Sequence, residues 1–337
     1  MKCFKYNYVI FNTADSLYKV PSDTDYYSVC MRDLESMPYV QIVPLPMSHM
    51  PYLVRLLRAL HFSRRVNHYI NLPLKSLWYP LMFKSKFSDD KPICFVILNS
   101  LDVEYLSYLK RVYKGSKIVL LHRDFISISQ HSNPQLPFNP ILDLEMTYDE
   151  GESQKYGFPH FSEIESKIHV DVAAVFESDV FFFGKAKDRL PEILDAYKVL
   201  TDAGLKVYFY LTGVPADMQE PLPGVEYASR FMSYQEVLVH SVNSRCILEI
   251  VQGSNQMGYT SRFLEAVIYG KRMITNHSYV KKSKFYDPDK IQFVEKMSDI
   301  NPSFVRRGNG FVDYNYQGEF SPTHMISRIE EELDNRR

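Results

Sequence analysis

Short apolar runs alternate with segments of helical spacing through the first part of the chain. The apolar runs have the length of buried strands, and the run at 92–98 is nearly continuous, as strands of a parallel sheet tend to be. Between the runs, apolar positions recur every three or four residues, which predicts amphipathic helices. The predicted strands are 6–11, 40–46, 92–98 and 117–122, and the predicted helices are 51–66 and 103–113. This alternation predicts a parallel sheet covered by helices.

A second alternating series begins near residue 177. Its first helix has Pro191 near its start and Gly204 after its end, as helix termini prefer. Ser233 and Glu236 form a capping box that opens another helix. The predicted strands are 179–183, 206–211, 245–250, 272–276 and 291–295, and the predicted helices are 189–203, the one from Ser233, and 261–270. The second series therefore predicts a second parallel sheet.

The pattern loosens between 125 and 176, where four prolines occur, and we place the domain junction there. Ser321 and Pro322 then have the positions of an N-cap and first residue of a final helix. The expected fold class is α/β, with two Rossmann-like parallel-sheet domains at 1–160 and 161–320 and a C-terminal helix at 321–337. Ligands of such sheets bind beyond the carboxyl ends of the strands.

Charge and composition narrow the class of protein. The formal net charge of −1 gives no strong field toward a polyanion, so nucleic acid is not an expected partner. The four cysteines include no C-x-x-C pair, which suits a reducing compartment. No stretch approaches the roughly 20 apolar residues of a membrane span. We expect a soluble, cytoplasmic protein.

A basic turn follows the strand predicted at 179–183. Gly184 lets the backbone approach a ligand closely, and Lys185, Lys187 and Arg189 come just before a helix. A helix N-terminus attracts anions, and arginine can bind two phosphate oxygens at once. The turn predicts a diphosphate site; the alternative is a strand–helix turn with solvated lysines.

The stretch 249–276 is the most informative part of the sequence. A polar, glycine-containing loop leads from a strand to a helix that we expect Ser261 to cap. Glu265 in this helix has apolar neighbours, where a carboxylate is costly unless it is paired or hydrogen-bonded. Glu265 could hold the two hydroxyls of a ribose. The alternative is a structural glutamate paired with Arg262 or Lys271.

This stretch resembles the donor half of GT-B glycosyltransferases. Many of them have a helix of pattern E-A-x-x-x-G-x-P-V-I, and here Glu265-Ala266 precedes Gly270-Lys271-Arg272-Met273-Ile274. The stretch is most similar to bacterial capsule and lipopolysaccharide glycosyltransferases, as are 178–190 and 147–158. The resemblance implies two domains facing a central cleft, a nucleotide-sugar donor held by 161–320, and an acceptor-side domain at 1–160.

The resemblance also implies an activity and donor contacts. The expected reaction is metal-independent, hexosyl-type transfer to a glycan or lipid-linked acceptor in bacterial surface polysaccharide synthesis. Met257 stands where the retaining branch has a second glutamate, and Glu249 is out of register, so the stereochemistry stays open. Arg230 is placed near the phosphates and Met232–Tyr234 near the base, although Arg230 and Tyr234 could simply pack. The expected donor-binding set is completed by Thr212, Gly213, Gln256, Gly258, Tyr259, Thr260 and Ser261.

In the first domain, polar residues follow predicted strands. They are Asn12, Thr13, Asn99, Ser100, His122, Arg123 and Asp124. His122 or Asp124 could act as a general base on an acceptor hydroxyl; the alternative for Asp124 is a helix cap or loop residue.

Residues 51–69 interleave leucines with arginines. One interpretation is an interfacial helix that touches anionic lipid at the membrane periphery. The alternative is a core-packing helix with a solvated basic face.

No cofactor or metal is expected. No G-x-G-x-x-G follows a strand, and the spacing from Gly253 to Gly258 is followed by Tyr259-Thr260 rather than by Lys-Ser/Thr. No pair of carboxylates or cluster of His and Cys suggests a metal site. Two competing functions remain, a nucleotide-sugar epimerase of the same double fold and a non-catalytic glycan-assembly protein.

Overall fold

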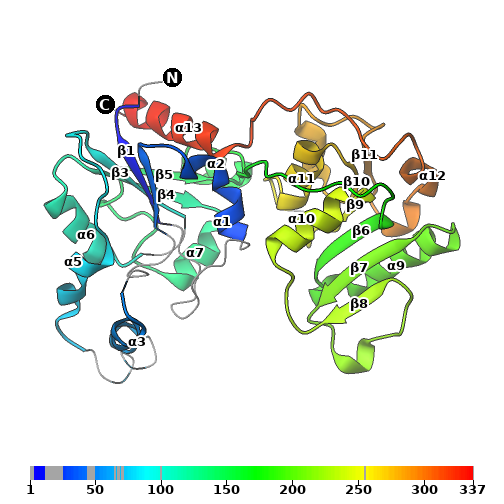
Figure 1. Cartoon of the computed structure of the whole chain (residues 1–337), viewed down its shortest axis with the longest axis horizontal. Coiled ribbons are helices and arrows are strands. Elements are labelled where there is room, and N and C mark those ends of the chain that lie inside the picture. Colours follow the sequence, from blue (N-terminus) through cyan, green and yellow to red (C-terminus); the bar gives the residue numbers. More distant parts are fainter. Residues whose placement is uncertain are drawn as a thin grey trace. The chain divides into compact units, whose positions relative to one another are not determined.

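Two parallel β-sheets, each flanked by helices, make up the computed structural model (Figure 1). It describes residues 4–11, 26–43, 50–63, 66, 69, 72–98, 101–253 and 256–336, with the backbone alone at 27, 132 and 187. The candidates Asn12, Thr13, Asn99 and Ser100, together with Arg64 and Arg65, lie outside the described residues.

The chain divides into two units, which are described separately. Unit 1 comprises residues 1–162 and 321–337, and unit 2 comprises 163–320. The expected α/β architecture of two Rossmann-like parallel sheets with a C-terminal helix is confirmed.

Unit 1 contains a five-stranded sheet, sheet A, with strand order β2-β1-β3-β4-β5 and parallel pairing throughout. Its elements are β1 (Asn7–Phe11), α1 (Tyr26–Cys30), α2 (Arg32–Glu35), β2 (Val40–Val43), α3 (Tyr52–His61), η1 (Lys75–Trp78), α5 (Tyr79–Met82), β3 (Ile93–Ile97), α6 (Val103–Val112), β4 (Lys117–His122), α7 (Ile126–Ser132), β5 (Leu144–Thr147) and α8 (Glu150–Tyr156). Every residue of β1 and β3 is buried, which explains their continuous apolar sequence.

The last helix, α13 (Pro322–Asn335), belongs to unit 1. Ser321 caps it, as expected, and the Ser321 hydroxyl donates to Asp33 at 2.7 Å. Glu330 accepts the backbone N–H of Lys5 at 2.5 Å. The chain therefore leaves unit 1 near residue 162 and returns to it for its final helix.

Unit 2 contains a six-stranded parallel sheet, sheet B, with strand order β11-β10-β9-β6-β7-β8. Its elements are β6 (Ser178–Lys185), η2 (Lys187–Arg189), α9 (Leu190–Asp202), β7 (Val207–Thr212), η3 (Ala216–Met218), β8 (Val225–Ala228), α10 (Tyr234–Val242), β9 (Ser244–Glu249), α11 (Ser261–Tyr269), β10 (Arg272–Thr275), η4 (Ser278–Lys282), β11 (Ile291–Phe293), η5 (Met297–Asp299) and α12 (Pro302–Val305). The capping box of Ser233 and Glu236 is confirmed at the start of α10.

Two apolar clusters cover the two faces of sheet B. The α9 stripe, with Ile193 and Leu200, packs in one cluster with η5 and α12. The α11 residues Phe263 and Leu264 pack in the other. Helices cover both faces of sheet B. Polar residues therefore gather at the amino and carboxyl ends of its strands.

No helix in the described part of the chain is both long and apolar enough to cross a membrane.

Gly204 and Gly270 provide a matched test of packing in unit 2, because both follow helices in the left-handed conformation, with φ of +72° and +63°. A Cβ at Gly270 would lie 2.6 Å from the carbonyl oxygen of Val312, whereas a Cβ at Gly204 would meet nothing closer than 4.0 Å. Gly204→Ala should lower the unfolding free energy by about 1–2 kcal/mol, the cost of the conformation. Gly270→Ala should cost about 3 kcal/mol or more in urea denaturation, because a clash is added. Equal losses would contradict the Gly270 packing.

Candidate functional site

The candidate site lies where the strand order of sheet B reverses, between β6 and β9. From this pair the chain builds outward to β7 and β8 on one side and to β10 and β11 on the other. Val180 of β6 lies opposite Cys246 of β9 in a parallel pair, so the loops after both strands leave from the same edge. Such a reversal is where open α/β sheets bind ligands. The two loops, 184–189 and 250–260, are the segments that the sequence singled out.

Hydrogen bonds join these two loops directly. The guanidinium of Arg189 donates to the carbonyls of Ile250 and Lys185, and Gln252 Nε2 donates to Asp188 Oδ2 at 2.8 Å. Burial lowers the pKa of Arg189 below its ordinary value. This corrects the expected role of Arg189, because its terminal nitrogens clamp the loops together rather than facing a phosphate. Its buried Nε has no hydrogen-bond partner within the described structure.

Lys185 is the cation of this turn that the structure shows exposed. Its side chain lies over Gly213, where a Cβ would come within 3.1 Å of Lys185 Cε. Thr212, at the end of β7, is buried, and its hydroxyl has no hydrogen-bond partner within the described structure. Gly184 is half-buried, and the side chain of Lys187 lies outside the description. Lys185, Thr212 and Gly213 therefore lie together at the carboxyl edge of sheet B.

Helix α11 points its N-terminus at the same edge. Its N-cap is Thr260, whose hydroxyl accepts the Phe263 N–H at 3.3 Å, so Ser261 is the first helical residue and not the cap that we expected. The Thr260 hydroxyl also donates a hydrogen bond to Glu249, so this hydroxyl acts both as a donor and as an acceptor. The free backbone N–H groups of this first turn give the edge a positive potential.

The loop before α11 is held by packing and by one histidine. The Tyr259 ring stacks on Phe263 at 4.5 Å, so it faces the core. The Gln256 carbonyl is hydrogen-bonded to His277 Nε2 at 3.0 Å, and Gly258 is buried. The structure thus gives Tyr259 a structural position and leaves Gln256 half-exposed.

Glu249 and His277 are buried polar residues that the sequence reasoning did not select. Glu249, the last residue of β9, accepts hydrogen bonds from the hydroxyls of Thr260 and Thr275, the latter at 2.5 Å. His277 Nδ1 lies 3.9 Å from the Glu249 carboxylate and has no hydrogen-bond partner in the described structure. The available signal was an acid at the end of a buried strand.

Glu265 is fully buried and engaged within the protein. It forms an ion pair with Arg262 and accepts hydrogen bonds from Ser241 at 2.9 Å and Tyr234 at 3.2 Å. These contacts favour the alternative of a structural glutamate paired with Arg262 over the expected ribose contact. Tyr234 is buried with it, so its hydroxyl does not face a base.

A second buried carboxylate, Glu165, adjoins this cluster. Tyr234 Oη lies 2.5 Å from Glu165 Oε1. Burial, and then the nearby charge of Glu265, raise the pKa of Glu165 well above its ordinary value. One guanidinium faces two carboxylates, so the charge balance of the cluster favours the protonated form of Glu165.

Arg262 connects this cluster to the edge of the sheet. Its guanidinium lies 3.4 Å from the Phe183 carbonyl and 5.1 Å from the Phe183 ring centre. Arg189 lies close enough that the charge of Arg262 helps to lower its pKa. The sequence suggested Arg262 only as a partner of Glu265.

The loop after β8 contributes an aromatic surface. Arg230 is exposed and its backbone carbonyl accepts a hydrogen bond from Tyr210 at 2.8 Å, while Met232 is half-buried. Phe231 between them is 58% exposed, with its ring centre 6.0 Å from that of Phe183. Phe231 was missed because a single phenylalanine in a loop carries no sequence signal.

In unit 1, the two candidate bases differ sharply. His122 is 1% exposed, lies 3.0 Å from Glu145 through Nε2, and stacks on Phe158. Glu145 also accepts the Phe138 N–H at 3.0 Å. His122 therefore anchors a loop and presents no nitrogen to solvent, which corrects its expected catalytic role. Asp124, after β4, is exposed.

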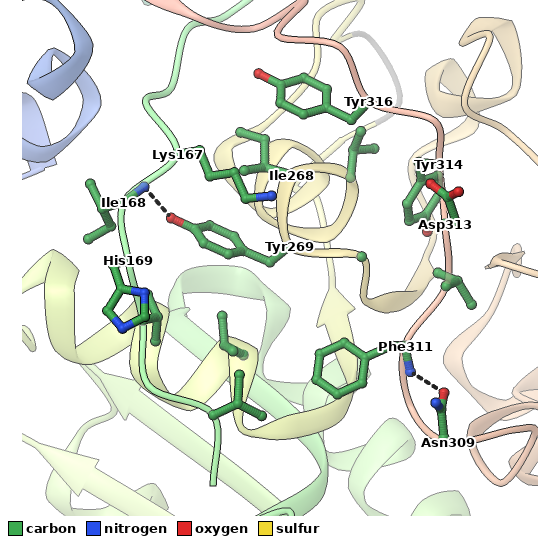
Figure 2. Close-up of a pocket in the computed structure, with 16 residues that line it drawn as sticks. Lys167, Ile168, His169, Ile268, Tyr269, Asn309, Phe311, Asp313, Tyr314 and Tyr316 are labelled. Carbon is green, nitrogen blue, oxygen red and sulfur yellow. Dashed lines mark hydrogen bonds between the residues drawn. The ribbon is translucent and has the colours of Figure 1, made fainter.

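A cavity of about 700 Å³ lies elsewhere in unit 2, beside the ends of α10 and α11 (Figure 2). Tyr269, whose hydroxyl accepts the Ile168 N–H at 3.2 Å, and Phe311 belong to its lining. Close to it, Lys271 is fully buried between Phe176 and Phe311, and burial lowers its pKa to about 7. None of the expected donor-binding residues lines this cavity.

No protein-family model matches the chain, and no curated protein matches it. Solved structures similar to it include T4 phage BGT with its UDP-glucose substrate, at 13% identity over 98% of this chain and 96% of that one, with a TM-score of 0.45. An α,α-trehalose-phosphate synthase (UDP-forming) from Burkholderia vietnamiensis is 9% identical over 98% and 96%, with a TM-score of 0.46. The Gap123 glycosylation-associated complex from Streptococcus agalactiae is 10% identical over 81% of this chain, with a TM-score of 0.45, and the chain spans 59% of that protein. At TM-scores below 0.5 we draw neither fold nor activity from these likenesses.

The protonated Glu165 predicts a pH dependence of stability. Its pKa is raised above 4.5 in the folded state, so above pH 4.5 the unfolded chain releases a proton that the folded chain retains. The unfolding free energy should therefore fall as pH rises from 4.5 through the folded pKa. Glu165→Gln, which keeps the shape without the ionisation, should flatten this fall in urea denaturation. The exposed Glu220→Gln is the control, and an unchanged pH profile for Glu165→Gln would contradict the assignment.

Proposed function

We propose that this protein is a GT-B glycosyltransferase and that unit 2 binds its nucleotide-sugar donor at the carboxyl edge of sheet B. The observation that carries the proposal is the meeting of the loops 184–189 and 250–260 where the strand order reverses. The sequence selected 184–189 for a diphosphate and 249–276 for the rest of the donor, and a reversal of strand order is where open α/β sheets bind ligands.

Most of the groups at this edge of sheet B suit the diphosphate of the donor. Lys185 is exposed, and the N-terminus of α11 begins at Ser261. A fixed helix dipole and a lysine stabilise the negative charge that develops on a departing nucleoside diphosphate. Lys187 is proposed to add a second cation. Arg189 and Arg262, held by backbone carbonyls and Glu265, raise the local positive potential without being free to follow a ligand.

The base is proposed to lie against the loop after β8. Phe231 offers an exposed ring, and aromatic side chains stack on any base. Met232 beside it is proposed to supply the backbone contact expected there, and Arg230 is proposed to lie near the phosphates. Gln256 and Gly213 remain proposed contacts to the phosphates or sugar.

The acceptor side is proposed from the sequence resemblance. A glycan or lipid-linked acceptor in bacterial surface polysaccharide synthesis fits the Glu265-Ala266 and Gly270–Ile274 pattern. The proposed transfer is hexosyl-type and metal-independent. Asp124 is the proposed general base, because His122 is buried and engaged.

Lys185→Ala should weaken nucleotide binding about tenfold or more, since a charge-assisted phosphate contact is lost. The measurement is calorimetry with UDP, GDP, ADP and CMP, followed by the same titration with the corresponding sugar nucleotides. Lys206→Ala is the matched control, because Lys206 is also exposed but precedes β7 at the opposite edge. If no nucleotide binds, or if Lys206→Ala has the same effect, the donor site is misplaced.

Asp124→Asn should reduce sugar transfer or donor hydrolysis by about 100-fold or more, the usual contribution of a general base. Nucleotide affinity should stay unchanged, because Asp124 belongs to unit 1 and the proposed donor site to unit 2. Binding without any turnover in the wild type would favour a non-catalytic glycan-assembly protein.

A further inference from the structure

Helix α3 presents leucines to solvent and buries an arginine. Leu53, Leu57 and Leu60 follow one another at intervals of four and three residues, which places them on one face of the helix. Leu53 is 71% and Leu57 59% exposed, whereas Arg58 is only 7% exposed. The Arg58 guanidinium lies 4.8 Å from the Phe62 ring centre and 3.7 Å from the Met82 sulfur. This corrects the expectation of a core-packing helix with a solvated basic face.

The apolar surface continues onto the elements that pack against α3. His61 at the end of α3 accepts a hydrogen bond from Trp78 Nε1 at 2.9 Å and contacts the Pro73 carbonyl at 2.7 Å. These bonds hold η1 and α5 beside α3 (Figure 1). We call the exposed side chains of the three elements the leucine surface: Tyr52, Leu53, Leu57, Leu60, Leu74, Leu77 and Leu81.

Exposed large apolar side chains are concentrated in this part of the chain. Of the 16 large apolar side chains exposed in the described parts of the chain, eight lie between residues 52 and 81. Monomeric soluble proteins rarely gather exposed apolar residues in this way, and such patches mark interaction sites.

The sequence that carries the leucine surface is basic, and Glu104 of α6 adjoins it by accepting a hydrogen bond from Tyr79 at 3.1 Å. The sequence from Ser36 to Ser88 contains seven Lys and Arg and no Asp or Glu. The rest of the chain carries 32 Lys and Arg against 40 Asp and Glu. Lys84 and Lys86, just after α5, are exposed. An apolar surface set in uniformly basic sequence is the pattern of an amphipathic element at an anionic membrane surface.

We propose that the leucine surface docks onto an anionic lipid bilayer. The leucines enter the boundary between headgroups and acyl chains, and the exposed Lys84 and Lys86 meet the anionic headgroups. Helix α3 has 10 residues, so it lies on the bilayer and does not cross it. Self-association through the same surface would bring two copies of this basic stretch together, which disfavours a second copy as the occupant.

Vesicle sedimentation of the full chain tests the proposal without nucleotide or sugar, so its outcome is independent of the proposed transferase activity. The wild type should bind vesicles that contain both phosphatidylglycerol and phosphatidylcholine. It should not bind vesicles made only of phosphatidylcholine. Raising the salt to about 0.5 M should weaken the binding severalfold, because surface charges are then screened.

Leu53→Glu with Leu57→Glu should reduce vesicle affinity about tenfold or more. Val112→Glu is the matched control, because Val112 is an exposed apolar residue of α6 in the same unit. Lys84→Gln with Lys86→Gln should reduce affinity severalfold and tests the charge separately if the leucine variant does not fold. Circular dichroism establishes that each variant is folded.

Three results would overturn the proposal: no binding of the wild type to anionic vesicles, an equal loss with Val112→Glu, or binding that neither variant pair reduces. A concentration-dependent dimer in sedimentation equilibrium, abolished by the leucine variant in a protein that ignores vesicles, would show instead that a second copy covers the surface.

Discussion

The parallel pairing of β6 with β9 is the constraint on which the candidate site depends. Because these strands are neighbours in sheet B although their ends, Lys185 and Glu249, are 64 residues apart in sequence, the loops that follow them leave from adjacent positions. Arg189 then bridges them by donating to a carbonyl in each. A guanidinium fixed in this way holds the two loops together, so it is less available to bind a ligand. Exposed groups such as Lys185 are better placed for the proposed contact with the phosphates.

A second constraint is the balance of charge beneath α11. Arg262 faces both Glu265 and, through Tyr234, Glu165. Burying two ionised carboxylates against one guanidinium would leave an unbalanced charge in a medium that solvates it poorly. The raised pKa of Glu165 removes this imbalance by keeping a proton on the residue. The resulting network ties the segment that enters unit 2 to the helix whose N-terminus faces the site.

The sequence predicted the sheets well where strands are buried on both faces. β1, β3, β4, β6, β7 and β9 each contain a run of three or more apolar residues, so they could be predicted without tertiary information. It missed β5 and β8 for two different reasons. Glu145 interrupts β5, and its hydrogen bonds with His122, 23 residues away, and with the Phe138 N–H make a buried carboxylate tolerable there. β8 is a half-exposed edge strand whose pattern does not differ from that of a loop.

Site residues could be located by sequence but not oriented. Glycine, lysine and hydroxyl residues after strands marked two loops that meet at one edge of sheet B, because the carboxyl ends of parallel strands share an edge. Which way Glu265 points depends on Ser241 and Tyr234, which no local pattern reveals.

The same limit governs amphipathic helices, and α3 and α9 illustrate it. Both have apolar residues at helical spacing, yet α9 turns its stripe into the core of unit 2 while α3 turns its stripe to solvent. What separates them is the opposite face. On α3 that face holds Arg58 and Ala59, and Arg58 finds Phe62 and Met82 as an enclosure for its guanidinium. Periodicity specifies that a helix has two faces, and only the neighbouring elements decide which of them meets water or lipid.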